Sequence, residues 1–257
     1  TDNKGLIANI RSYAVFDYLK AKLQGDDDDG GYAISADVLS ATQFGAPQKR
    51  MRFVVMGIRK DITGVVKLPE GKYKDGPYRT VEDAIKDLED VEPVYNVSDD
   101  ESGIKLQAKT DLSELAQTLR DSEVLHNHII TKTTPIAMER FKGLDQGQNF
   151  HSLSDEMKTN TYTDVTRTQN TIYLRLKYDE PSGTVVNVRK SMWVHPTKDR
   201  AVSIREAARL QTFPDSFVFC GTKDKQYQQV GNAVPPIMAK AIAKKLANQL
   251  NKALSQK

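Results

Sequence analysis

The chain has 257 residues, 39% of them hydrophobic and 28% charged, which is typical of a globular protein with one large or two small domains. No apolar run approaches the roughly 20 residues of a membrane-spanning helix, so no membrane is expected. The first residues lack the organisation of a signal peptide. Cys220 is the single cysteine, which excludes intrachain disulfides and predicts a cytoplasmic location.

The net charge of +3 is unevenly distributed along the chain. Residues 82–123 hold 13 acidic and 4 basic residues, a net charge of −9, so this segment is not expected to face phosphates. Residues 197–257 hold 11 basic and 4 acidic residues, a net charge of +7, which suits a polyanion. A lysine-coated, solvated helix explains this second excess equally well.

The first 62 residues predict part of an α/β sheet domain. Apolar residues recur at helical spacing from Leu6 to Leu23, before a glycine and a run of aspartates that predicts a solvated turn. Residues 32–39 alternate in polarity, as a strand does. The nearly continuous apolar run of residues 52–58 predicts a strand buried on both faces.

The middle of the chain, residues 63–196, is polar and irregular and predicts a loop-rich insertion. Short strands are expected at residues 171–177 and 184–188, and a short helix at residues 81–88. Regular structure returns at Ser203, where the sequence Ser-Ile-Arg-Glu predicts a capped helix to about Gln211. The last helix is expected to begin at Pro235 and Pro236.

Three ordered segments carry a family resemblance. They are ATQFGAPQKRMRFVVMGIR at residues 41–59, SIREAARLQTFPD at residues 203–215 and GNAVPP at residues 231–236. They resemble the eighth, ninth and tenth motifs of DNA cytosine-5 methyltransferases, whose variable target-recognition domain lies between the eighth and ninth. Smaller likenesses at residues 80–88, 126–128, 182–185 and 195–196 extend the resemblance over nearly the whole chain.

The resemblance implies a fold and a division of labour. The fold would be the C-terminal part of a Rossmann-like α/β methyltransferase domain that binds S-adenosylmethionine, with an inserted, irregular, β-rich target-recognition domain. Residues 1–62 and 197–257 would belong to the catalytic domain, and residues 63–196 to the recognition domain. The cofactor's glycine-rich loop, the Pro-Cys-Gln nucleophile and the Glu-Asn-Val acid of the family are absent from this sequence. An N-terminal half, in the same or a separate polypeptide, would supply them.

The family chemistry points to two arginines. The base is flipped out of the duplex and a cysteine thiolate adds to carbon 6, so negative charge develops toward O2 and N3 of the ring. By resemblance Arg52 is the cation near O2, which would stabilise the transition state. Arg50 lies two residues earlier on an extended segment and would support it, at a phosphate or at the flipped nucleotide. The alternative is a pair of solvated charges in ordinary salt bridges.

Further site residues follow from the same resemblance. Asn232 and Val234 would complete the S-adenosylmethionine pocket, although a plain turn at the start of a helix also fits them. Thr184, Arg189 and Lys190 are candidates for contact with double-stranded DNA, at phosphates or guanine edges. An ordinary strand is the alternative for Thr184.

Other polar residues are expected to be structural. Gln48 would fix the turn at Pro47. Arg205 and Arg209, four residues apart on one helix face, would form ion pairs with a neighbouring domain, with a phosphate contact as the alternative. Glu206, Ala207 and Leu210 would cap and pack the helix at residues 203–211. His126 and His128 lack companion ligands at metal spacing, so no metal site is predicted. Cys220 lacks the Pro-Cys-Gln context, which favours a partly buried structural thiol.

Three hypotheses for function follow. The first is a C-terminal fragment or split subunit of a DNA cytosine-5 methyltransferase, inactive without the N-terminal half and exposing apolar surface in its absence. The second is a stand-alone, sequence-specific DNA-binding module without catalysis. The third is a related transfer-RNA methyltransferase, which the long acidic and polar middle fits less well. The sequence does not reveal the target DNA site. It also leaves open whether the methylation belongs to a restriction-modification system or to regulation.

Overall fold

The structure is a computed structural model that describes residues 15–25, 30–62, 64–159, 168–186 and 192–255. The chain divides into two compact units. Unit 1 comprises Thr1–Leu39, Met51–Glu70 and Ala239–Lys257, and unit 2 comprises Ser40–Arg50 and Gly71–Met238. These boundaries differ from those of the three expected segments, whose assignment to a catalytic and a recognition domain stays a prediction.

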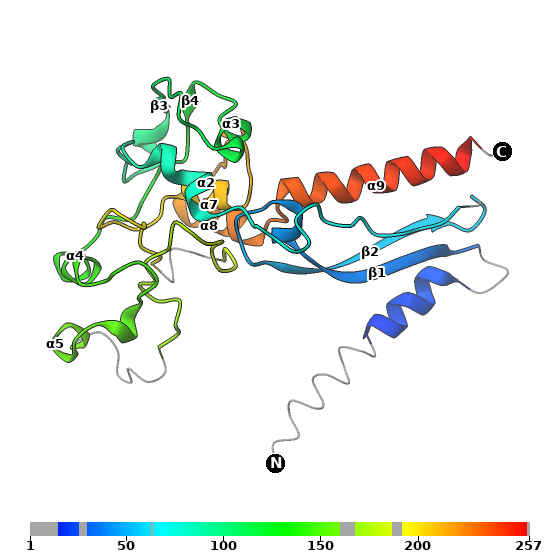
Figure 1. The fold of residues 1–257 in the computed structure, drawn as a ribbon, viewed down its shortest axis with the longest axis horizontal. Helices are drawn as coiled ribbons and strands as arrows, with labels where there is room; N and C mark the ends of the chain where they lie inside the picture. The colour runs from blue at the N-terminus through cyan, green and yellow to red at the C-terminus, as the bar shows by residue number, and fades with distance from the viewer. Residues whose placement is uncertain (1–14, 26–29, 63, 160–167, 187–191, 256–257) are drawn as a thin grey trace, which may run out of the picture. The chain divides into compact units, whose positions relative to one another are not determined.

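A strand hairpin is the centre of unit 1. Strands β1 (Tyr32–Ser40) and β2 (Met51–Arg59) lie side by side in a two-stranded sheet (Figure 1). Backbone hydrogen bonds from Ala41 N to Arg50 O and from Lys60 N to Gly31 O frame the pair, so the strands run antiparallel. Residues 15–24 are helical, and most of the long helix α9 (Pro236–Leu254) also belongs to this unit. Residues 6–14 of the predicted first helix lie outside the described residues.

The prediction that β2 is buried on both faces is wrong for this chain. Met56 and Ile58 are buried, but Met51 and Phe53 are 55% and 53% exposed. The reason is that two strands leave most of each sheet face uncovered in the described residues. Phe16 packs edge-on against the Phe53 ring, with the ring centroids 4.9 Å apart, and covers part of one face.

Unit 2 consists of short helices, turns and very short strands joined by loops. Its elements are η1 (Ala41–Phe44), α2 (Val81–Ile85), η2 (Lys86–Leu88), η3 (Ser98–Asp100), β3 (Ile104–Lys105), α3 (Glu114–Leu119), β4 (Val124–Leu125), α4 (Pro135–Lys142), η4 (Phe150–Ser152), α5 (Asp155–Lys158), α7 (Ile204–Leu210) and α8 (Lys223–Asn232). Strands β3 and β4 pair antiparallel. The predicted helix at residues 81–88 is confirmed as α2 and η2.

The two short strands expected in the middle segment are not formed. Residues 171–173 make a turn, because Tyr173 adopts a positive φ of 52° that a strand cannot contain. Arg175 then forms a single bridge with Val194. Residues 184–186 are irregular, and residues 187–188 lie outside the described part. The middle segment is therefore irregular, as expected, but where it is described it is not β-rich.

Helix α7 lies at the centre of the main core. It packs against α2 and α8 (Figure 1), and every one of its residues is buried. The predicted capping box is confirmed, since Ser203 Oγ accepts from Glu206 N at 3.0 Å and Glu206 Oε2 accepts from Ser203 N at 2.8 Å. Such a cap contributes about 1 kcal/mol. Ala207 and Leu210 are fully buried in the same core, which confirms their packing role.

A second apolar cluster lies under α4 and η4. Phe150 and Phe141 each approach the Tyr173 ring, with centroid separations of 5.9 and 5.4 Å. The cluster consists of Ala137, Phe141, Leu144, Phe150, Leu153, Tyr173 and Val194. It shares no buried member with the main core. Among the described helices, none has the length and apolarity to cross a membrane.

Candidate functional site

The first two motif segments meet in unit 2 at a buried glutamine. Gln48 Nε2 donates to Leu210 O at 3.1 Å and to Gln211 Oε1 at 2.7 Å, and Gln48 Oε1 accepts from Val185 N at 3.1 Å. Gln211 Nε2 continues the chain of hydrogen bonds to Val230 O at 2.7 Å. Gln48 therefore does more than fix the turn at Pro47, because it joins the segments at residues 185, 210–211 and 230.

Arg50 makes a second connection between the same segments. Its side chain is buried, at 1% exposure. Nη1 donates to Val185 O at 2.7 Å, and Nη2 donates to Gly231 O at 3.0 Å and Ala233 O at 2.8 Å. A planar guanidinium suits this task because its donors point in fixed directions. The structure thus places the predicted phosphate-contacting arginine on backbone carbonyls of its own chain.

The turn held by Arg50 carries both predicted cofactor residues, Asn232 and Val234. Helix α8 ends at Asn232, and Ala233 is extended, with φ −66° and ψ 156°. Arg50 takes the carbonyls of Gly231 and Ala233, while the side chains of Asn232 and Val234 are exposed. Val234 is 45% exposed. Both side chains are therefore accessible for contact with a ligand.

Arg52 has different surroundings. It lies in unit 1, whereas Arg50 lies in unit 2. Its side chain is partly exposed at the start of β2, and Nη1 donates to Met51 O at 2.7 Å. This contact engages one of the five N–H donors of the guanidinium.

Thr184 is fixed next to the exposed side chain of Lys49. Thr184 Oγ1 donates to Lys49 O at 2.7 Å, and Lys49 N donates to Ser182 O at 2.8 Å. Lys49 Nζ lies 3.1 Å from Glu180 Oε2 in a surface ion pair. The other two DNA-contact candidates, Arg189 and Lys190, lie outside the described residues.

The predicted structural role of the helix arginines is confirmed. Arg209 is fully buried and pairs with Asp215 and Asp87, which come from different parts of unit 2. Arg205 is also buried and donates to His126 O at 2.8 Å and to Phe217 O at 2.7 Å. The two arginines fasten the segments before and after α7 onto the helix.

A buried polar group around Glu206 was not predicted in this detail. Burial raises the pKa of Glu206, but the bidentate Arg200 guanidinium outweighs burial and holds that pKa far below its usual range. His195 Nε2 lies 3.6 Å from Glu206 Oε1, and burial lowers the pKa of His195 to about 4. Arg200 was not predicted from sequence because it lies outside the motifs.

His126 and His128 have structural partners. His128 is buried, with Nε2 2.9 Å from Val91 O and Nδ1 3.0 Å from Ser203 Oγ, and burial lowers its pKa. His126 Nδ1 lies 3.1 Å from Asp100 O. In the described residues, no group of three or more histidine, cysteine or acidic side chains is arranged to hold a metal ion.

The expectation of a partly buried Cys220 is wrong. Its side chain is exposed, whereas the preceding Phe219 is 3% exposed and packs into the main core. Residues 217–220 form neither helix nor strand. The mutual packing of the Phe213, Phe217 and Phe219 rings therefore decides which side chains of this segment are buried.

The segments joined by Gln48 and Arg50 are the ones that carry the family resemblance. The family model for C-5 cytosine-specific DNA methylases matches residues 9–248. The chain belongs to this family. The DNA methyltransferase kinship expected from the three motifs is thereby confirmed at the level of the family.

Two curated methyltransferases are similar to this chain. The chain is 28% identical over 246 residues to the type II methyltransferase M.DdeI of Desulfomicrobium norvegicum, covering 90% of this chain and 58% of that protein. It is 35% identical over 144 residues to the type II methyltransferase M.AquIB of a Picosynechococcus species, covering 52% of this chain and 95% of that protein.

A crystal structure of a putative E. coli DNA modification methyltransferase encoded within a prophage matches with a TM-score of 0.66. The two chains are 27% identical, and the match covers 86% of this chain and 61% of the other. This likeness supports a mixed α/β methyltransferase fold. The chain spans about half the length of several curated relatives that it matches, among them M1.HphI of Haemophilus parahaemolyticus at 47% and M.BbvI of Brevibacillus brevis at 48%.

Proposed function

We propose that this chain is the target-recognition and site-completing part of a DNA cytosine-5 methyltransferase, corresponding to its C-terminal half. The observation that carries the proposal is the buried connection of the motif segments through Gln48 and Arg50. A recognition segment at Val185 and an exposed turn at Asn232 are thereby held by one rigid frame, as an enzyme that must align DNA with a cofactor requires.

Arg52 is the residue of this chain that acts on the substrate. The reaction builds negative charge on the cytosine ring toward O2, and a fixed guanidinium there stabilises the transition state more than the ground state. Its partly exposed position at the start of β2 supports this role. Arg50 has the separate role of a positioning residue, because its donors are directed at main-chain carbonyls.

S-adenosylmethionine supplies the methyl group when it is bound. The residues of this chain that would hold it are Asn232, through its amide, and Val234, through apolar contact. The exposure of both side chains on a turn fixed by Arg50 fits such a role. The glycine-rich loop that binds most of the cofactor in this family belongs to the N-terminal half.

Double-stranded DNA is the partner on the recognition side. Thr184, with Lys49 beside it, would contact the phosphate backbone, and Arg189 and Lys190 would contact phosphates or guanine edges. The Lys49–Glu180 ion pair is exposed, so its attraction is small and a phosphate can replace the carboxylate.

An N-terminal half is the second partner. Unit 1 exposes several large apolar side chains on its helix and strands, namely Val15, Tyr18, Leu19, Val38, Met51 and Phe53. A complementary half that adds strands and helices would cover them. The match to M.AquIB supports a separate polypeptide as one arrangement, because 144 residues cover almost all of that relative.

The test is methyl transfer from labelled S-adenosylmethionine to unmethylated duplex DNA. The chain is assayed alone and mixed with the separately expressed N-terminal half. We expect transfer by the mixture only, loss of transfer with Arg52→Ala, and full transfer with Cys220→Ser. Transfer by the chain alone that Cys220→Ser abolishes would refute the proposal.

The second candidate is a stand-alone DNA-binding module. The frame that supports Thr184 is complete within unit 2, which favours DNA binding by this chain without its partner. Tight, sequence-selective binding by the chain, combined with no transfer by the mixture, would favour this candidate. Preference for folded RNA over duplex DNA would favour a transfer-RNA enzyme instead.

A further inference from the structure

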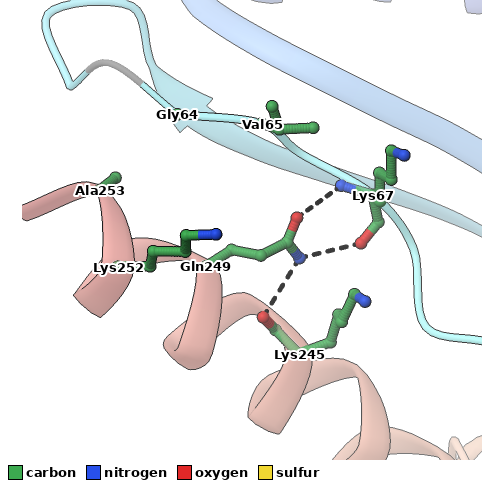
Figure 2. A pocket seen from close by; sticks show the side chains of 7 residues that line it. All are labelled: Gly64, Val65, Lys67, Lys245, Gln249, Lys252 and Ala253. Atoms are coloured by element: carbon green, nitrogen blue, oxygen red, sulfur yellow. Dashed lines mark hydrogen bonds between the residues drawn. The ribbon is translucent and has the colours of Figure 1, made fainter.

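A groove in unit 1 lies between the chain after β2 and the C-terminal part of α9. It has a volume of about 570 Å³ and is lined by Gly64, Val65, Lys67, Lys245, Gln249, Lys252 and Ala253 (Figure 2). The lining residues come from two segments about 180 positions apart in the chain. Three of the seven are lysines and none is acidic.

The walls of the groove are held together by Gln249. Its Oε1 accepts from Lys67 N at 2.7 Å, and its Nε2 donates to Lys67 O at 2.9 Å and to Lys245 O at 3.1 Å (Figure 2). Gly64 lets the chain approach α9 closely, because a Cβ at this position would lie 2.9 Å from Ala253 Cβ. The main-chain positions of the lysines are therefore fixed relative to one another.

The three lysines differ from many others on the surface. Lys49, Lys86, Lys142, Lys158, Lys177 and Lys198 each pair with a carboxylate. Among the described residues, Lys67, Lys245 and Lys252 have no carboxylate within ion-pairing distance. Helix α9 has four lysines and no acidic residue in its sequence. The groove thus concentrates positive charge that the chain does not neutralise.

We propose that the groove formed by Lys67, Lys245 and Lys252 in unit 1 binds the phosphodiester backbone of duplex DNA. The proposal rests on the proposed function, because it adds a second, sequence-independent contact for the same partner. Lysine suits such a contact, since its ammonium is a mobile point charge that follows phosphates without demanding a particular base. The acid-free lining favours a polyanion over a mixed-charge protein surface.

The salt dependence of binding is the appropriate measurement. Each phosphate that a lysine neutralises releases counterions and adds about 0.9 to the slope of log affinity against log salt concentration. The chain is titrated onto a fluorescent random-sequence duplex at several sodium chloride concentrations. We compare it with the triple variant Lys67→Gln, Lys245→Gln, Lys252→Gln and with the triple variant carrying Arg at the same positions.

A charge-matched control distinguishes the groove from net charge. The triple variant Lys74→Gln, Lys105→Gln, Lys109→Gln removes three exposed lysines from unit 2. We expect the groove variant to flatten the slope by about 2.7, for three lost contacts. The arginine variant should retain the slope, and the control should change it by less than about 0.5. Thermal melting of each variant verifies that the fold is intact.

Two results would overturn the proposal. Equal changes of slope in the groove and control variants would mean that only net charge matters. Displacement of the duplex by inorganic phosphate at constant ionic strength, abolished in the groove variant, would identify the groove as a site for a small anion. Methyl transfer by the mixture with the N-terminal half is measured in parallel, because its loss in the unmodified chain would instead refute the proposed function.

Discussion

Arg50 Nη2 donates a hydrogen bond to the carbonyl oxygen of Ala233 at 2.8 Å, although the two residues lie 183 positions apart. The same guanidinium reaches Val185 O, so one side chain positions both the segment at Val185 and the turn that follows helix α8. A buried arginine with several main-chain acceptors is costly to remove, because the acceptors lose their partner in a place that water reaches poorly.

We expect Arg50→Ala to lower the free energy of unfolding of the chain by about 1–3 kcal/mol, the cost of leaving a buried acceptor without its donor. Arg50→Lys should restore only part of the lost free energy of unfolding, since an ammonium cannot donate to several acceptors in fixed directions. Urea denaturation measures both. The matched control is Arg52→Ala, at a partly exposed site, with an expected change within about 0.5 kcal/mol. Equal stability of the two alanine variants would contradict the positioning role.

Substitutions of Arg52 and Arg50 should change different kinetic parameters of the reconstituted enzyme. We expect Arg52→Ala to lower kcat by about 10²–10³-fold, the range for loss of one transition-state donor, with little change in KM for S-adenosylmethionine. A partly active Arg50 variant should instead show a raised KM for the cofactor, because the turn at Asn232 loses its support. A normal kcat in Arg52→Ala would exclude it from the reaction.

The buried pairs of Arg209 with Asp87 and Asp215 predict a large structural effect. Arg209→Met removes the shared cation of two buried carboxylates, although Asp87 keeps Arg120 at 2.9 Å and Asp215 keeps Arg205 at 4.0 Å. We therefore expect a loss of about 3 kcal/mol in the free energy of unfolding, the lower end of the range for breaking a buried pair. Lys142→Gln is the control, because it breaks the exposed Lys142–Glu139 pair and should cost less than about 1 kcal/mol. Chemical denaturation of the two variants tests the contrast; similar losses would mean that burial of the Arg209 pairs is unimportant.

Stability should fall as the solution becomes acidic. Burial lowers the pKa of His195 from 6.5 to about 4, and the pKa of His128 is lowered in the same direction. The unfolded chain therefore binds protons below pH 6.5 that the folded chain refuses. The stabilisation is complete above this value and is lost progressively as the pH falls toward 4, on the order of 3 kcal/mol for His195.

Urea denaturation from about pH 7 to about pH 4.5 measures this dependence. His195→Gln should make it shallower, while His151→Gln, outside the Glu206 group, should leave it unchanged. An unchanged pH dependence in His195→Gln would show that His195 does not contribute to it.

The local elements of the fold could be predicted from sequence, but the long-range contacts could not. The capping box at Ser203 and Glu206 lies within four residues, so it is visible in the sequence itself. The partners of Arg50 and Gln48 lie 135 residues or more away, and an arginine just before a strand gives no sign that it faces carbonyls. The burial of Arg50 and the long-range hydrogen bonds of Gln48 are visible only in the three-dimensional structure.

The predicted strand at residues 171–177 failed for a related reason. Its β-branched and aromatic residues have strand propensity, but such propensity depends on packing. Here Tyr173 turns with a positive φ to place its ring against Phe141, while Arg175 donates to His195 O at 2.9 Å and pairs with Asp199. Tertiary contacts outweighed the local preference. The assignments of Arg52, Asn232, Val234 and Thr184 to the reaction came from the family resemblance and stay predictions.

The separate aromatic cluster around Phe150 has a consequence for how the chain can diverge. Because it shares no buried member with the core under α7, its side chains can be exchanged for others of similar volume without repacking that core. The hydrogen bonds of Gln48 and Arg50 to distant segments are then unaffected. Novel surface shapes can accumulate around residues 135–153 at little cost to folding, so chimaeras that borrow this stretch from a relative should retain the core that contains α7.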